Sequence, residues 1–167
     1  MPKEKMIELL YELMKNSRRS DRDLAKILDV SQPTVTRMRR KLETEGYVLE
    51  YTLIPNFVKL GFEIVAFTFL NVARTCTTPD MSPEELSRRA HKWIAKNKNI
   101  VFSGSGEGIG KNCVVASLHR DFTDYTRFVS EFRKEWQRNI IDVDSFIVTL
   151  KGTMPKQFSF RHLEEIP

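Results

Sequence analysis

The spacing of apolar residues changes near residue 60, and this change constrains the fold more than any other feature of the chain. In residues 1–50, apolar side chains recur at steps of three and four, which is the spacing of amphipathic helices. From Glu63 onward they alternate along short runs, as in strands, and two long helical patterns lie between these runs. Pro55 and Gly61 punctuate the connection. The sequence therefore predicts two domains joined by a linker.

Residues 1–50 are predicted to form three helices. The first carries apolar residues at helical spacing, namely Met6, Leu9, Leu10, Leu13 and Met14. Ser20 and Ser31 are suitable N-caps for the second and third helices, and Gly46 stands where a C-terminal cap is expected. The predicted buried stripes of these two helices are Leu24, Ile27 and Leu28, and Val35, Met38 and Leu42.

The second and third helices are short, and a tight turn at Asp29 and Val30 separates them. The third helix is basic over residues 37–41 and contains no acid before Glu43. This pattern is typical of a helix-turn-helix. Residues 48–54 have strand character, and we expect them to form a wing or the strand that leads into the next domain.

Residues 63–152 follow the order β-α-β-β-α-β, which is the ferredoxin-like pattern. The predicted elements are a strand at 63–73, a helix at 82–97, strands at 99–106 and 112–120, a helix at 121–139 and a strand at 144–152. The predicted fold class is therefore α+β. A winged helix-turn-helix occupies residues 1–54, a linker 55–62, the ferredoxin-like domain 63–152 and a C-terminal tail 153–167.

The strand at 63–73 is apolar on both faces. One face carries Ile64, Ala66, Leu70 and Val72, and the other carries Val65, Phe67 and Phe69. A ferredoxin-like sheet covers one face with its own helices, so the second apolar face needs another cover. We expect a second copy of the chain, in a homodimer or higher oligomer with Val65, Phe67 and Phe69 in the interface. The alternative cover is the C-terminal tail, which contains Phe158 and Phe160.

Composition sets further limits. The chain has 167 residues and a formal charge of +5, which allows a polyanionic partner without requiring one. Two cysteines, Cys76 and Cys113, are too few for a disulfide framework. The start of the chain is a charged amphipathic helix and not a signal peptide, and the longest apolar run is too short to span a bilayer. We therefore expect a cytoplasmic protein.

Residues 23–48 resemble the helix-turn-helix of the Lrp/AsnC family of transcription regulators. The matching residues are Leu24, Ala25, Leu28, Val30, Ser31, Thr34, Val35, Arg37, Arg40, Leu42 and Gly46. The stretch that follows, through Leu60 and Gly61 into the strand at 63–73, is similar to that family's linker. The resemblance implies a sequence-specific DNA-binding regulator that acts on double-stranded DNA as a homodimer or higher oligomer, with a small-molecule effector as a candidate modulator.

The face of the third helix opposite its buried stripe is the predicted DNA-binding surface. Pro33, Arg37 and Arg40 lie on this face, and Thr36 and Lys41 flank it. Gln32 and Thr34 belong to the first turn, which normally enters the major groove. Arginine suits the edge of guanine, and glutamine suits that of adenine. The alternative is a basic face that only meets water.

Basic residues near the second helix are candidates for phosphate contacts. These are Arg19 and Arg22, together with Lys15 and Arg18. Arg39 lies closer to the buried edge of the third helix, so we expect it to pair with an acid of the first helix instead of DNA.

Residues 104–112 form a glycine-rich segment, GSGEGIGKN, between two predicted strands. It lacks the spacing of a P-loop and the third glycine of the dinucleotide-binding fingerprint. It also lacks the aspartate that the resemblance predicts there. Two interpretations stay open, a mobile hairpin loop and an effector pocket at a dimer interface. The candidate effector-binding residues are Gly104, Gly106, Glu107, Gly108 and Lys111.

The sequence gives catalysis little support. His91, His119 and His162 lie in separate segments without metal-ligand spacing, so we expect no metal, no cofactor and no enzyme. Siroheme decarboxylases resemble this two-domain plan and are the alternative, but the histidine-aromatic-arginine segment associated with them is missing. A metabolite sensor that has lost DNA binding would not need the basic face of the third helix.

Overall fold

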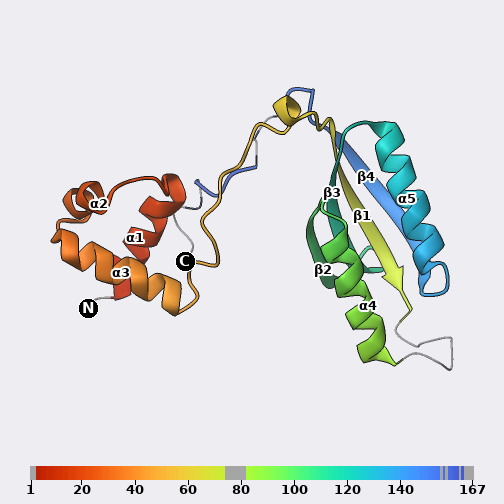
Figure 1. The fold of residues 1–167 in the computed structure, drawn as a ribbon, viewed down its shortest axis with the longest axis horizontal. Helices are drawn as coiled ribbons and strands as arrows, with labels where there is room; N and C mark the ends of the chain where they lie inside the picture. Colours follow the sequence, from red (N-terminus) through yellow and green to blue (C-terminus); the bar gives the residue numbers. More distant parts are fainter. Residues whose placement is uncertain (1–2, 74–81, 155, 157, 162, 164–167) are drawn as a thin grey trace. The chain divides into compact units, whose positions relative to one another are not determined.

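The computed structural model describes residues 3–73, 82–154, 156, 158–161 and 163. The chain forms two units (Figure 1). The first contains residues 3–54 and the described residues from 156 onward, and the second contains the described residues between 55 and 154.

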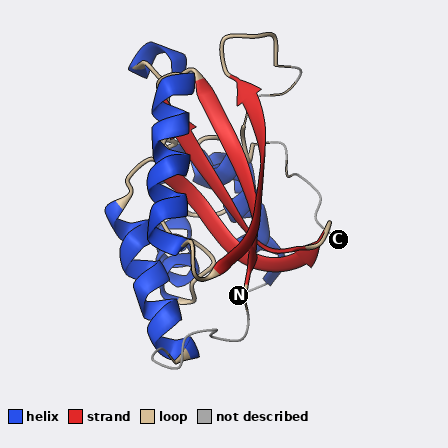
Figure 2. Ribbon diagram, turned by 90° about the vertical axis from the view of Figure 1, so that its right-hand side faces the viewer, coloured by secondary structure: helices blue, strands red, loops and turns tan. Residues whose placement is uncertain are grey.

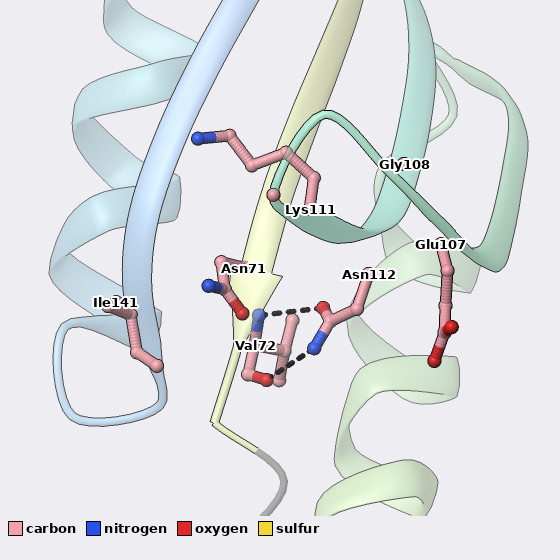
Figure 3. Close-up of a pocket in the computed structure, with 8 residues that line it drawn as sticks. Asn71, Val72, Glu107, Gly108, Lys111, Asn112 and Ile141 are labelled. Carbon is pink, nitrogen blue, oxygen red and sulfur yellow. Dashed lines mark hydrogen bonds between the residues drawn. The ribbon is translucent and has the colours of Figure 1, made fainter.

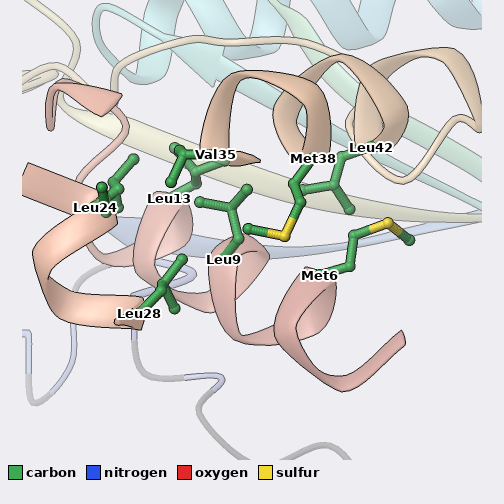
Figure 4. Close-up of a cluster of buried hydrophobic side chains, with 9 residues drawn as sticks. Met6, Leu9, Leu13, Leu24, Leu28, Val35, Met38 and Leu42 are labelled. Atoms are coloured by element: carbon green, nitrogen blue, oxygen red, sulfur yellow. The ribbon is translucent and has the colours of Figure 1, made fainter. Parts of the chain in front are cut away.

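The first unit is built from α1 (Lys3–Lys15), α2 (Asp21–Leu28) and α3 (Gln32–Thr44). Their inward-facing apolar side chains form one core (Figure 4), which contains Met6, Leu9, Leu13, Leu24, Ala25, Leu28, Val35, Met38 and Leu42. The predicted stripe of α3 is confirmed, and each of its side chains is fully buried. The predicted stripe of α2 is wrong at Ile27, which is 50% exposed; Ala25 takes the inward position instead.

The predicted caps determine where these helices begin and end. The Ser20 and Ser31 side chains accept hydrogen bonds from the backbone N–H groups of Asp23 and Thr34, at 3.1 and 3.3 Å. At the end of α3, Gly46 adopts a φ of +75°. The Tyr47 N–H donates to the Leu42 carbonyl at 2.9 Å, which completes a Schellman motif. Glycine favours this stop because the left-handed conformation costs it no Cβ clash.

The strand predicted over residues 48–54 does not form, so the prediction is wrong for this segment. Val48, Tyr51, Thr52 and Ile54 are residues that favour strands, but this segment has no partner strand among the described residues of the chain. Leu49 and Leu53 are 94% and 75% exposed. A strand needs ladder partners as well as β-propensity, and the sequence pattern reports only the propensity.

The second unit has the predicted β-α-β-β-α-β order. Its elements are a short 3-10 helix η1 (Val58–Leu60), β1 (Ile64–Val72), α4 (Pro83–Lys96), β2 (Ile100–Gly108), β3 (Lys111–His119), α5 (Phe122–Trp136) and β4 (Ile140–Thr149). The strands form an antiparallel sheet in the order β2-β3-β1-β4. Figure 2 shows helices along one side of this sheet, which leaves its other face open.

The β2–β3 connection is shorter than predicted. Gly104 and Gly106 lie in β2, as in the predicted strand at 99–106, and β2 continues to Gly108, so most of the glycine-rich segment belongs to a strand. Only Ile109 and Gly110 lie between the strands, and both have a positive φ, of 47° and 72°. Two consecutive positive φ values are typical of the tight turn that joins a two-residue hairpin.

The two faces of β1 are oriented as predicted. Ile64, Ala66 and Leu70 are buried on the helix side, where Leu70 packs with Phe132 and Trp136. The open face carries a row of aromatic rings across the sheet. Phe67 lies opposite Phe146 of β4 and opposite Ala116 of β3, and Ala116 in turn lies opposite Phe102 of β2. The exposed fractions of Phe102, Phe67 and Phe146 are 58%, 38% and 66%.

A fully buried histidine lies in the helix-side core of the second unit. The His119 ring packs between Tyr125 and Phe128, with centroid distances of 5.4 and 5.1 Å. Its Nε2 bonds the Ser117 hydroxyl at 2.8 Å, and its Nδ1 lies 3.7 Å from the Asp124 carboxylate. Burial lowers the pKa of His119, and the nearby Asp124 charge only partly opposes this shift. His119 is therefore a structural residue that is neutral in the folded protein at pH 7.

We predict that His119 makes the second unit less stable in acid. The unfolded chain takes up a proton near pH 6.5, above the lowered pKa of the folded state, so the free energy of unfolding decreases as pH falls below that value. His119→Gln keeps a polar group near Ser117 and should flatten this dependence between pH 7 and pH 5. Urea unfolding followed by tryptophan fluorescence tests this, because Trp93 and Trp136 both lie in this unit. An equal pH dependence in both proteins would contradict the prediction.

Candidate nucleic-acid interface

The core of the first unit determines which side of α3 faces outward. Because Val35, Met38 and Leu42 are buried, the residues on the opposite side are held in solvent. The exposed residues of this side are Gln32, Pro33, Thr36, Arg37, Arg40 and Lys41, with Thr34 half-buried beside them. The structure therefore brings the seven predicted residues of α3 onto one surface, which we call the α3 face.

Contacts within the protein hold some side chains of the α3 face more than others. The Arg37 guanidinium donates to the Thr34 hydroxyl at 3.4 Å, a long bond that a stronger acceptor would replace. Lys41 lies 3.5 Å from Glu45, one turn further along the helix. Arg40 is exposed and forms no ion pair within the part of the chain that the structure describes. Arg37 and Arg40 are thus the two arginines of this face that can meet an external acceptor without breaking a strong contact.

Thr36 and Arg39 are held by Asp21, the first residue of α2. The Thr36 hydroxyl donates to Asp21 at 2.7 Å. The Arg39 guanidinium donates to the same carboxylate through Nε and Nη2, at 3.0 and 2.8 Å. Arg39 was expected to pair with an acid of the first helix, and this is wrong, because its partner begins the second helix. The reason is that α2 crosses close to α3 at its N-terminal end.

The four basic residues predicted to contact phosphate groups also differ in whether an acid of the protein already holds them. Arg19 forms an ion pair with Glu12 of α1, and Lys15 bonds the same carboxylate at 3.0 Å. Arg22 and Arg18 are exposed, and neither has an ion pair among the described residues. Arg22 is therefore better placed than Arg19 to meet a phosphate group.

A hollow of about 420 Å³ lies at one end of the sheet in the second unit (Figure 3). Its lining residues are Asn71, Val72, Glu107, Gly108, Gly110, Lys111, Asn112 and Ile141. The candidates Glu107, Gly108 and Lys111 are brought together here, whereas Gly104 and Gly106 do not line it. The Phe102 ring occupies the space beside Gly104, where a Cβ would approach it to 3.2 Å.

The polar groups of this hollow are already arranged by contacts within the sheet. Asn112 accepts a hydrogen bond from the Val72 N–H at 2.8 Å and donates to the Val72 carbonyl at 2.7 Å. Lys111 forms ion pairs with Asp142 and, at 2.7 Å, with Asp144, and its side chain is only 8% exposed. The hydrogen bond from Lys111 lowers the pKa of Asp142. The charge of Lys111 is therefore neutralised before any ligand arrives.

Among the described residues, no group of His, Cys, Asp and Glu could hold a metal ion, and no helix is long and apolar enough to cross a membrane. His91 is exposed, with Nδ1 lying 2.9 Å from the Ser87 carbonyl. His162 lies outside the described residues.

Sequence reasoning missed the acids that organise both sites. Asp21 was not singled out, although the acidic first turn of α2 faces a basic helix in the motif. Asp142 was missed because the last strand was predicted to begin at residue 144, and Asp144, although inside that predicted strand, was not connected with Lys111. Their alternation with Val143 was the signal that could have extended the strand.

Comparison with known proteins agrees with this arrangement. Residues 3–48 match the family model described as winged helix-turn-helix DNA-binding. An HTH-type transcriptional regulator of Pyrococcus horikoshii is 27% identical over 124 residues, which are 73% of this chain and 75% of that protein. The leucine-responsive regulatory protein of Rhizobium meliloti is 26% identical over 119 residues, 71% of this chain and 73% of that protein. LrpC of Bacillus subtilis is 38% identical over 58 residues, 35% of this chain and 40% of that protein.

Solved structures share the fold over nearly the whole chain. A transcriptional regulator from Neisseria meningitidis, in complex with L-Met, has a TM-score of 0.78 at 14% identity and covers 96% of both chains. An AsnC family transcriptional regulator from Agrobacterium tumefaciens has a TM-score of 0.76 at 19% identity, over 100% of this chain and 97% of that chain.

Taken together, the fold and the matches define a protein with a winged helix-turn-helix followed by an antiparallel α+β domain. This is the architecture of a class of transcription regulators. Within that class, the chain is similar to regulators of the Lrp/AsnC family, in sequence to the leucine-responsive regulatory protein and LrpC and in fold to AsnC.

Proposed function

We propose that this protein is a cytoplasmic transcription regulator that binds double-stranded DNA sequence-specifically as a homodimer or higher oligomer. The observation that carries the proposal is the α3 face, where a fully buried apolar stripe holds Arg37 and Arg40 outward. Relatives named as HTH-type transcriptional regulators support it. In this proposal residues 1–54 bind DNA, 55–62 link, 63–152 dimerise and bind the effector, and 153–167 form a tail.

The proposed division of labour on DNA follows from the contacts of each side chain. Arg37 and Arg40 read base edges, with Gln32, Pro33 and Thr34 beside them at the entering end of the helix. Lys41 and Arg22 neutralise phosphate groups, which positions the helix without selecting a sequence. Thr36 and Arg19 contribute less than the sequence predicted, because Asp21 and Glu12 already hold them.

We propose further that the open sheet face is the dimer interface. Phe102, Phe67 and Phe146 lie across this face and are 58%, 38% and 66% exposed, so a monomer would leave their rings in contact with water. Val65 and Phe69 lie beside them on the same face of β1. A second copy supplies an identical face and closes the pair by twofold symmetry.

The hollow beside Lys111 is the proposed effector site. Because Asp142 and Asp144 outnumber the single cation between them, we expect a ligand with a positively charged group to be favoured over one with only a carboxylate. The L-Met complex of the Neisseria meningitidis regulator shows that a protein of this fold binds an amino acid.

The first prediction tests DNA recognition. Arg37→Ala and Arg40→Ala should each cost about 1–3 kcal/mol at the specific site, because a lost base contact is not replaced. Non-specific binding should weaken less. Fluorescence anisotropy titrations measure both, with Lys26→Ala as a control that removes an exposed cation of α2. Equal affinity of wild type and the Arg37→Ala/Arg40→Ala protein would refute the assignment of α3.

The second prediction tests assembly. Phe67→Asp places an unpaired charge in the proposed interface and should cost several kcal/mol of association free energy. Light scattering should give a dimer or larger species for the wild type and a dissociated or aggregated variant. Phe122→Asp is the matched control, since Phe122 is 60% exposed at the start of α5, outside the open sheet face. A monodisperse wild-type monomer at micromolar concentration would rule out the interface.

The third prediction concerns the effector. The aspartate that the family resemblance places near this hairpin is missing, so we expect weak or no thermal shifts with the twenty standard amino acids. Any ligand that does bind the folded state raises the melting temperature by mass action. Glu107→Gln should weaken such a ligand because Glu107 lines the hollow, and Asp142→Asn should weaken it because Asp142 is paired with the lining Lys111. Gly106→Val should not, since Gly106 neither lines the hollow nor pairs with a lining residue and its added Cβ meets no atom within 4 Å. A strong shift with a standard amino acid that survives both charge substitutions would place the effector elsewhere.

A further inference from the structure

The carboxylate of Asp21 joins α2 to α3 through three hydrogen bonds. It accepts hydrogen bonds from the Thr36 hydroxyl at 2.7 Å and from Arg39 Nε and Nη2 at 3.0 and 2.8 Å. The side chains of Asp21 and Arg39 are only 22% and 21% exposed. One acid therefore holds two side chains of the helix that is proposed to read DNA.

The other side of the Arg39 guanidinium is covered as well. Its Cζ lies 6.0 Å from the centre of the Tyr51 ring, within the range of a cation–π contact. Tyr51 is held in turn by a hydrogen bond from its hydroxyl to Glu43 at 3.0 Å. Arg39 is thus fixed between a carboxylate and an aromatic ring.

The ion pair with Asp21 occupies the N–H groups with which Arg39 could otherwise bind a phosphate group. A guanidinium offers two parallel N–H groups, and a carboxylate and a phosphate compete for the same fork. In a helix-turn-helix, the helix before the reading helix crosses the DNA backbone, so the first turn of α2 lies where phosphate groups are expected. An Arg39 side chain released from Asp21 would therefore already lie near the phosphate groups.

Asp21 stays ionised under ordinary conditions. The hydrogen bond from Thr36, together with the pairing with Arg39, holds the pKa of Asp21 below its usual value. Both charges of the Asp21–Arg39 ion pair are therefore present at neutral pH, and a rise in pH above neutral does not release Arg39 by protonating Asp21.

Resting on the DNA-binding function proposed above, we propose that Asp21 is a positioning residue that limits the electrostatic part of DNA affinity. It keeps one cation per subunit, Arg39, away from the phosphate backbone, and it holds Thr36 against α2. Phosphate contacts strengthen binding to every sequence alike. With Arg39 withheld, base contacts from Arg37 and Arg40 carry a larger share of the binding free energy.

The salt dependence of DNA binding tests this. Asp21→Asn keeps the size of the side chain but removes the charge that holds Arg39. Binding to a labelled duplex of mixed sequence, measured across a series of salt concentrations, should show a steeper plot of log K against log salt, by about 0.9 per subunit. This corresponds to an extra loss of about eightfold in affinity per subunit for each tenfold rise in salt.

Three further variants separate this effect from a general change of charge or fold. Asp23→Asn removes an acid from the same turn of α2, but its carboxylate accepts from the Ser20 hydroxyl at 2.6 Å and holds no arginine, so the slope should stay at the wild-type value. Arg39→Gln alone should also leave the slope unchanged. In the Asp21→Asn/Arg39→Gln protein the steeper slope should disappear. Circular dichroism melting of each variant, compared with the wild-type melting curve, shows whether the substitution has unfolded part of the chain.

The outcomes are distinct. An unchanged slope in folded Asp21→Asn overturns the inference, because the released Arg39 would then never reach the DNA. A slope shallower by about 0.9 per subunit in Arg39→Gln also overturns it, because Arg39 would then already contact DNA in the wild type. If Asp21→Asn does not fold, Asp21→Ser, which also removes the carboxylate, takes its place in the same comparison with Arg39→Gln. A wild-type protein that binds no duplex refutes the proposed function itself. Wild-type binding that depends on Arg37 and Arg40, with no effect of Asp21→Asn, refutes only the role of Asp21.

Discussion

The burial of Val35, Met38 and Leu42 is the constraint on which the rest of the first unit depends. These three side chains anchor α3 in a core shared with α1 and α2, and their position determines that Arg37 and Arg40 face outward. The caps then set the length of the helix that is presented, from Ser31 to the left-handed Gly46. A basic helix without this anchoring could rotate about its axis, and its arginines would not define a surface.

In the second unit, burial of one face of the sheet likewise determines which side chains face outward. Helices cover one face, where Leu70 packs against Phe132 and Trp136. The other face keeps a row of phenylalanines, so the fold is incomplete in apolar burial until something covers it. Beside that face, the Lys111 ion pairs and the two bonds of Asn112 hold the end of the sheet in place. In the proposed function, the helix-covered face of the sheet forms the core of the second unit and the open phenylalanine face forms the dimer interface. The proposed effector site, the hollow beside Lys111, lies at one end of the same sheet.

Elements governed by local periodicity were predictable from the sequence. The helices, the strand order, the serine caps and the two faces of β1 follow from spacing and turn chemistry over a few residues. The strand at 48–54 was wrong because its propensity had no partner strand, and Ile27 was wrong because Ala25 packs inward in its place. The residues between 106 and 112 were predicted to form a loop, although the ladder between β2 and β3 also pairs Gly108 with Lys111.

The polar contacts were the hardest to predict, since they join residues distant in sequence. Arg39 meets Asp21 across 18 positions, and Lys111 meets Asp142 across 31. No period reveals such pairs, because they depend on how two elements cross or on the register of a sheet. They also change the functional interpretation, since a cation counted as available from its residue type is neutralised by a carboxylate in the fold.

The central claim is that a twofold-symmetric protein reads DNA through α3. The most direct test is recovery of the DNA fragments bound by the full chain, selected from a genomic library and sequenced. We expect an enriched sequence whose two halves are related by twofold symmetry, with centres one helical turn apart, about 34 Å, or a multiple of it. Fragments without any enriched sequence, or with the same enrichment in the Arg37→Ala/Arg40→Ala protein, would contradict the claim.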